Sequence, residues 1–212
     1  MTLPEPAHQF IYSRLAWSLV AAAAAVAAAA RHGVLGRRAL AGLGMAAALP
    51  QWLPGAWSPA YWLGLAFQLP SAFTVALCAL ALGRQWLGRP SAPVLAPPIA
   101  AVLAAAGAWL YLDAAGWLAG GIYYLGFGPL SAPLAALLLA SACALAVASG
   151  AAVQAAAALF AALAAFMLVR LPTGNLWDAI LDPFLWVWAV LVCARSVRAN
   201  AQRLIHGRRG AP

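Results

Sequence analysis

Long apolar runs separated by short, arginine-bearing connections are the feature that most constrains how this 212-residue chain can fold. Hydrophobic residues make up 66 % of the sequence and charged residues only 8 %, whereas a typical soluble domain is about one-quarter charged. A helix that crosses a membrane needs about 20 apolar residues. The chain is therefore predicted to be a single integral membrane domain over residues 1–212, an all-α polytopic bundle of about seven spans, within a range of about six to eight.

The placement of the arginines predicts the topology. The chain has 12 arginines and no lysine, and basic residues collect in the cytoplasmic loops of membrane proteins. The loops Arg31–Arg38 and Gly83–Pro90 are therefore expected in the cytoplasm, with the N-terminus outside. Residues 195–212 hold five arginines and form the expected basic cytoplasmic tail.

Seven apolar segments are expected to span the membrane in this arrangement. They are Leu15–Ala30, Ala39–Leu49, Pro59–Leu82, about Pro93 to Leu112, Ser131–Ser149, Ala152–Val169 and a last segment that begins near Pro183. Ala114–Leu130 is rich in glycine and aromatic residues, so it is either an interfacial or re-entrant element or an eighth span. An eighth span would turn the basic tail outward, against the charge bias, and seven spans are preferred.

The residue types present exclude several function classes. A retinal Schiff base requires a lysine amine, and the chain has none. None of the three histidines lies in an apolar run, and the three cysteines have no metal-ligand spacing, so no haem, other cofactor or metal site is predicted. Nucleic-acid binding is not expected either, because the arginines flank apolar segments as membrane topology requires.

Polar chemistry is concentrated in the stretch Arg170–Pro183, which holds two of the four acidic residues. Asn175 is a natural N-cap for a helix that begins at Leu176, and Asp178 would lie in the first turn, where the helix dipole stabilises it. If that helix continued, Asn175, Asp178 and Asp182 would share one face. The simplest interpretation is the capped start of an interfacial helix.

The functional interpretation of the same stretch is a substrate-binding site at the outer membrane face. The two carboxylates can bind a cation, orient a sugar hydroxyl or act as acid and base, and Arg170 can hold a phosphate. The candidate binding residues are Arg170, Asn175, Trp177, Asp178, Asp182 and, from another segment, Gln68. No catalytic residue is assigned, because no established catalytic motif accompanies them.

Gln68 belongs to a polar stripe in the third expected span, with Pro70, Ser71 and Thr74. Pro70 removes one backbone hydrogen bond, and nearby serine and threonine side chains commonly satisfy such a defect. The alternative is a kinked helix that lines a solute path, with Gln68 as its most exposed polar group.

Together these features predict a multi-pass protein of a bacterial-type inner membrane. The preferred function is a non-catalytic accessory subunit, or a small channel or carrier, that works with another membrane protein, because the spans hold almost no ionisable residues. The alternative is a membrane enzyme or binding protein for a lipid-linked or sugar-containing substrate, using Asp178, Asp182 and Arg170. The expected partners are the lipid bilayer, another membrane protein, and anionic lipid at the basic tail.

Overall fold

The computed structural model describes residues 3–33, 35–88, 94–150 and 152–209, with side chains up to residue 203. Over this part of the chain the protein is all-helical, with 78 % helix and no strands. Some residues of the predicted segments lie outside this part. They are Arg89 and Ala151 in two predicted loops, and Pro93 at the predicted start of the fourth span. The side chains of Arg208 and Arg209 also lie outside it.

Within the described residues, four helices are long and apolar enough to cross a membrane. They are α1 (Pro6–Ala30), α5 (Pro97–Ala114), α7 (Ser131–Ala148) and α10 (Pro183–Arg209), the last over Pro183–Arg203. Two shorter apolar helices accompany them, α4 (Ala72–Trp86) and α8 (Val153–Val169). The remaining elements are α2 (Arg37–Ala48), α3 (Pro59–Phe67), α6 (Ile122–Leu125), α9 (Leu176–Ile180) and two 3₁₀ turns, η1 (Leu49–Trp52) and η2 (Gly55–Trp57).

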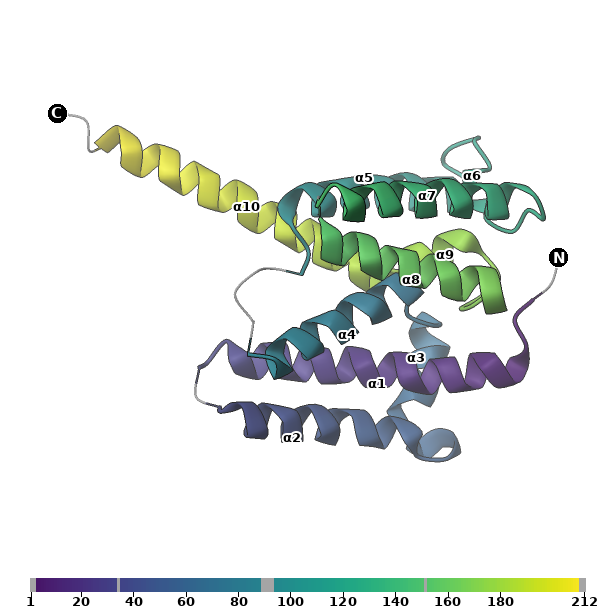
Figure 1. The fold of residues 1–212 in the computed structure, drawn as a ribbon, viewed down its shortest axis with the longest axis horizontal. Helices are drawn as coiled ribbons and strands as arrows, with labels where there is room; N and C mark the ends of the chain where they lie inside the picture. The colour runs from purple at the N-terminus through teal and green to yellow at the C-terminus, as the bar shows by residue number, and fades with distance from the viewer. Residues whose placement is uncertain (1–2, 34, 89–93, 151, 210–212) are drawn as a thin grey trace.

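The helices lie roughly side by side, as Figure 1 shows. The pair α1 and α2 forms one side of the molecule, α4 crosses from this pair towards α8, and α5, α7 and α10 lie beyond. The start of α2, the end of α4 and the far part of α10 point towards one end, which is arginine-rich. The start of α1 and the short helices α6 and α9 lie at the other end.

Small side chains set how closely these helices approach. The core that joins α4, α5, α8 and α10 combines large residues such as Phe73 and Leu185 with buried alanines, and small residues let helix backbones pack tightly inside lipid. At Gly107 of α5 an added Cβ would collide with the indole of Trp186 from α10. The same indole donates to the Ala104 carbonyl at 2.9 Å, which fixes α10 against α5.

The third expected span, Pro59–Leu82, is not one continuous helix but is interrupted near Pro70. The helix α3 ends at Phe67, and α4 begins only at Ala72. Gln68 between them has φ 62°, outside the right-handed helical region, and Pro70 has no N–H to continue a helix. Ser71 then caps α4, its Oγ accepting from the Thr74 N–H at 3.1 Å.

Two other connections follow local sequence signals. The segment between Ala114 and Leu130 contains one four-residue helix, α6, which is far too short to cross a bilayer. The turn between α7 and α8 falls at Ser149 and Gly150, between the expected spans Ser131–Ser149 and Ala152–Val169, and Gly150 adopts φ +73°. Ala114–Leu130 is therefore a connection between two candidate spans and not an eighth one.

Candidate functional site

The predicted cap at Asn175 is confirmed. Its Oδ1 accepts from the Trp177 N–H at 2.9 Å, and α9 begins at Leu176. The Asn175 side chain is fully buried, and its Nδ2 donates to the Tyr123 carbonyl at 3.2 Å. The Trp177 indole also donates to the neighbouring Ile122 carbonyl, at 2.8 Å. Asn175 and Trp177 thus attach α9 to α6.

Asp178 lies beside two hydroxyl groups at the same junction. It accepts from the Thr173 hydroxyl at 2.6 Å and from the Tyr123 hydroxyl at 3.1 Å. Burial raises the pKa of the Asp178 carboxyl, and these two hydrogen bonds partly oppose that rise. Burial and the nearby Asp178 charge raise the pKa of Tyr123 to about 12. At neutral pH the Tyr123 hydroxyl therefore stays protonated and donates a hydrogen bond to Asp178.

Asp182 is in a different environment, and the predicted shared helical face with Asn175 and Asp178 is wrong. The helix α9 ends at Ile180, and Leu181 is extended, with φ −137° and ψ 134°. Asp182 is 5 % exposed. Its Oδ1 accepts from the Leu185 N–H at 2.7 Å, and its Oδ2 accepts from the Ser71 N–H at 2.6 Å.

Asp182 therefore connects the starts of two helices that are far apart in sequence. Ser71 directly precedes α4, and Leu185 lies in the first turn of α10. A carboxylate is stabilised near the positive N-terminal end of a helix dipole, and Asp182 contacts two such ends. We call the segments Gln68–Ser71 and Leu181–Asp182 together the interruption junction.

The helix α1 packs against the interruption junction. The Tyr12 hydroxyl donates to the Pro70 carbonyl at 2.7 Å, which supplies a partner for a backbone group outside any helix. The ring of Phe184 packs edge-on against Trp17, with the ring centres 5.5 Å apart. It also packs against Phe67, at 5.2 Å. The junction thus combines helices α1, α3, α4 and α10.

The other two predicted binding residues form neither an ion pair nor a hydrogen bond with Asp178 among the described side chains. Arg170 ends α8 in a left-handed conformation, with its guanidinium 5.0 Å from the centre of the Phe166 ring. Among the described side chains the one ion pair joins His8 and Glu5, so Arg170 pairs with neither Asp178 nor Asp182. Gln68 is exposed in the α3–α4 connection. Of the six candidates, the structure brings together Asn175, Trp177 and Asp178.

Sequence reasoning missed the part played by Tyr123 and Asp113. Asp113 is 3 % exposed, and its Oδ2 accepts from the Tyr123 N–H at 2.7 Å. Its Oδ1 is buried without a hydrogen-bond partner. One feature of the sequence could have indicated this contact. Asp113 ends an apolar run, and an aromatic segment follows it directly.

The structural role of Arg14 was also not predicted from the sequence. It is 6 % exposed within α1 and donates from Nη1 to the Gln51 carbonyl at 2.7 Å. The Ser58 hydroxyl donates to the same carbonyl, also at 2.7 Å. An ionisable residue inside an apolar helix is itself a signal. Here Arg14 holds α1 against the turns that follow α2.

Comparisons of this chain with protein-family models, with curated proteins and with solved structures find no match. In the part of the chain that the structure describes, no three His, Cys, Asp or Glu side chains gather as metal ligands would. Function is therefore argued from the arrangement of the helices and their polar contacts.

Proposed function

We propose that this protein is a non-catalytic accessory subunit of a membrane complex, in which α10 contacts another membrane protein. The observation that carries the proposal is the position of α10, which projects well beyond the other helices (Figure 1). Only 11 % of its most apolar window is buried, against 33 % for α1. The helix α10 is the least covered of the four candidate spans.

The length of α10 supports this role. Its 27 residues correspond to about 40 Å of helix, whereas the hydrocarbon core of a bilayer is about 30 Å thick. Trp186 fixes the first part of the helix to α5, while Leu191, which precedes the basic end of the helix, is 47 % exposed. Helices associate in lipid through close side-chain packing, and the exposed side chains of Val187, Val190 and Leu191 offer an apolar face of α10 for such packing.

The polar contacts support a non-catalytic role. Asp182 holds the starts of α4 and α10, and Asp178 holds α9 against α6. Each carboxylate thus has a separate structural partner, and Arg170 lies on the Phe166 ring. This arrangement does not gather the three charged groups around one substrate.

The proposed topology has seven passes, α1, α2 continued by the turns η1 and η2, α4, α5, α7, α8 and α10, with the N-terminus outside and the C-terminus in the cytoplasm. Its support is the alternating direction of these helices in Figure 1 and the gathering of the arginine-bearing helix ends on one side. A bacterial-type inner membrane is proposed as the location from the composition of the chain. The basic end of α10 is proposed to attract anionic lipid in the cytoplasmic leaflet.

Site-specific photo-crosslinking in native membranes tests the subunit proposal. A photoreactive residue at Leu191 of α10, which is 47 % exposed, should give an adduct with one protein of discrete mass. The same residue at Leu138 of α7, which is 72 % exposed, should give lipid adducts only. Protein adducts at neither position, together with a monomeric mass in native mass spectrometry, would refute the subunit role.

Cysteine labelling tests the proposed topology separately. In a chain without its three native cysteines, Ser196→Cys should react with a membrane-impermeant reagent only after the cytoplasmic face is opened. Ala115→Cys, at the opposite end of the bundle, should react from outside. Reaction of Ser196→Cys from outside would overturn the orientation.

A second candidate function has one specific observation in its favour. Asp178 is half-buried between the Tyr123 and Thr173 hydroxyls and has a raised pKa, and groups with perturbed pKa values collect at functional sites. In this proposal they orient a hydroxyl of a lipid-linked or sugar-containing substrate, with Arg170 nearby for a phosphate. A polyprenyl-phosphate-linked sugar should then bind the wild type and not Asp178→Asn, with both proteins folded by circular dichroism. Equal binding by both proteins would remove this candidate.

A further inference from the structure

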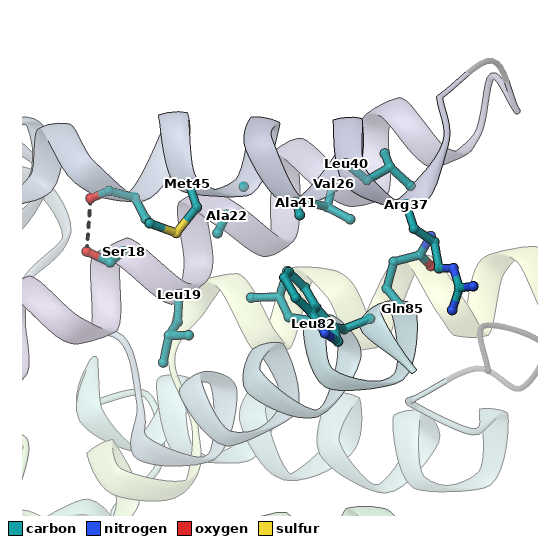
Figure 2. A pocket seen from close by; sticks show the side chains of 13 residues that line it. Ser18, Leu19, Ala22, Val26, Arg37, Leu40, Ala41, Met45, Leu82 and Gln85 are labelled. Atoms are coloured by element: carbon teal, nitrogen blue, oxygen red, sulfur yellow. Dashed lines mark hydrogen bonds between the residues drawn. The ribbon is translucent and has the colours of Figure 1, made fainter. Parts of the chain in front are cut away.

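An apolar cleft lies between α1, α2 and α4, away from the polar contacts described above (Figure 2). Its volume is about 230 Å³. Its apolar lining comes from all three helices and includes Leu19, Ala22, Val26, Leu40, Met45 and Leu82. At one end, the Ser18 hydroxyl donates to the Ala48 carbonyl at 3.2 Å and ties α1 to α2 (Figure 2).

The other end of the cleft is basic. A second cavity of about 370 Å³ is lined by Arg37, Arg38, Ala41 and Trp86. Arg37, Ala41 and Trp86 also line the apolar cleft, so the two cavities adjoin. In Figure 2, Arg37 and Gln85 lie at the end opposite Ser18. The combined space is apolar along its length and positively charged at one end.

The positive charge at that end has no counter-ion within the described protein. Arg37 and Arg38 form no ion pair with any described carboxylate, since the one pair found there joins His8 and Glu5. The Arg37 guanidinium instead lies over the backbone at Gly88, where an added Cβ would be 3.1 Å from Nη1. A guanidinium binds a phosphate through paired hydrogen bonds. The charge therefore complements an anionic head group.

The length of the cleft fits one leaflet of a bilayer. From Arg37 to Ala48 the helix α2 advances by about 16 Å, at about 1.5 Å per residue. Half of a hydrocarbon core of about 30 Å is about 15 Å. A lipid whose phosphate lies at the arginines can therefore extend one acyl chain along the cleft as far as the Ser18–Ala48 hydrogen bond.

We propose that this cleft binds an anionic phospholipid, with its phosphate on Arg37 and Arg38 and one acyl chain between α1, α2 and α4. An acyl chain gains little by leaving the bilayer for another apolar surface, because lipid tails are as apolar as the helices. Selection therefore depends on the head group, and a zwitterionic choline lipid is disfavoured by its own positive charge next to two arginines. This site is distinct from the tail of α10 and does not depend on the subunit role.

Native mass spectrometry of the full chain tests the head-group assignment. The protein is released from nanodiscs that contain equal amounts of phosphatidylglycerol and phosphatidylcholine, and the retained lipid is counted. The wild type should retain phosphatidylglycerol at least about fivefold over phosphatidylcholine, and Arg37→Gln with Arg38→Gln should remove most of this preference. The control, Arg84→Gln, removes an arginine that donates to Gln154 of α8 at 2.7 Å and lines neither cavity, and it should keep the preference.

Three results would overturn the assignment. They are equal retention of the two lipids by the wild type, equal loss of preference in the double variant and in Arg84→Gln, and release of phosphatidylglycerol by inorganic phosphate alone, which indicates a site for small anions only. Circular dichroism and thermal melting confirm that each variant is folded. If the double variant does not fold, Arg38→Gln alone should reduce the preference.

A second pair of variants tests the place of the acyl chain. Ala41 lines both cavities, so Ala41→Leu should fill the space and reduce the retained phosphatidylglycerol by at least about threefold. Ala46 lies on the exposed side of the same helix and does not line the cleft, so Ala46→Leu should leave retention unchanged. Equal retention by the two variants would place the lipid outside the cleft and refute the proposal.

Discussion

Replacing Asp182 with alanine is expected to destabilise the whole bundle, although the residue lies in an irregular connection. The carboxylate accepts from the Leu185 N–H at 2.7 Å and from the Ser71 N–H at 2.6 Å. One bond caps α10 and the other holds the start of α4, so both helices lose a fixed end when the side chain is removed. Asp182 is 5 % exposed, so water has little access to the two N–H groups that donate to it.

The expected size of the loss follows from these two hydrogen bonds. A hydrogen bond to a charged group contributes about 1.5–3 kcal/mol, and an unsatisfied buried donor costs about 1–3 kcal/mol. An alanine in place of an aspartate cap costs about 0.5–2 kcal/mol on its own. Because these contributions overlap, we expect Asp182→Ala to lower the free energy of unfolding by about 3–5 kcal/mol.

Reversible unfolding in mixed micelles, followed by far-ultraviolet circular dichroism, measures this loss. Glu5→Ala is the control, because Glu5 is an exposed acid whose one ion pair is with His8 at the surface, and it should change the free energy by less than about 0.5 kcal/mol. A loss below about 1 kcal/mol for Asp182→Ala would show that the two hydrogen bonds do not hold the helix starts.

Three further predictions concern the packing of α10 and the contacts of α9. Gly107→Ala should lower the free energy of unfolding by about 1–3 kcal/mol, because the added methyl group collides with the Trp186 indole. Asn175→Ala should cost about 1–2 kcal/mol, measured by the same unfolding assay, because α9 loses its cap and α6 loses a hydrogen bond. For Asp178, whose pKa is raised by burial, the folded state binds the proton more tightly than the unfolded chain. Stability should therefore fall as the pH rises from the unfolded to the folded pKa, and Asp178→Asn should remove this part of the pH dependence.

Each of these predictions has its own contradicting result. For Gly107, the control is Gly42→Ala, since Gly42 faces open space in α2 and the change should be neutral or stabilising by up to about 1 kcal/mol. Equal effects at the two glycines would argue against close packing of α5 on α10. An Asn175→Ala protein as stable as the wild type would argue against the cap. An unchanged pH profile in Asp178→Asn would assign the titration to another group.

Several local features could be read from neighbouring residues. Asn175 caps α9, α10 begins at Pro183, and the α7–α8 turn falls at Ser149 and Gly150. Each depends on side chains or backbone preferences within a few residues, so no knowledge of the fold is needed. Pro183 also disfavours helical geometry at Asp182. This signal argues against a helix that places Asn175, Asp178 and Asp182 on one face, and residue spacing alone does not reveal it.

The apolar composition and the scarcity of charge within the long apolar runs predicted, without coordinates, an all-helical chain, and the described residues form apolar helices that are compatible with a membrane. Which helix faces meet was decided only in three dimensions, because helices that are apolar all round have no polar side to orient them. Inside lipid they pair where small residues such as Gly107 and Gly44 permit close approach. That packing brings Ser71 to Asp182, 111 residues away in sequence, and Tyr123 to Asp178. It also forms the cleft that ends at Arg37.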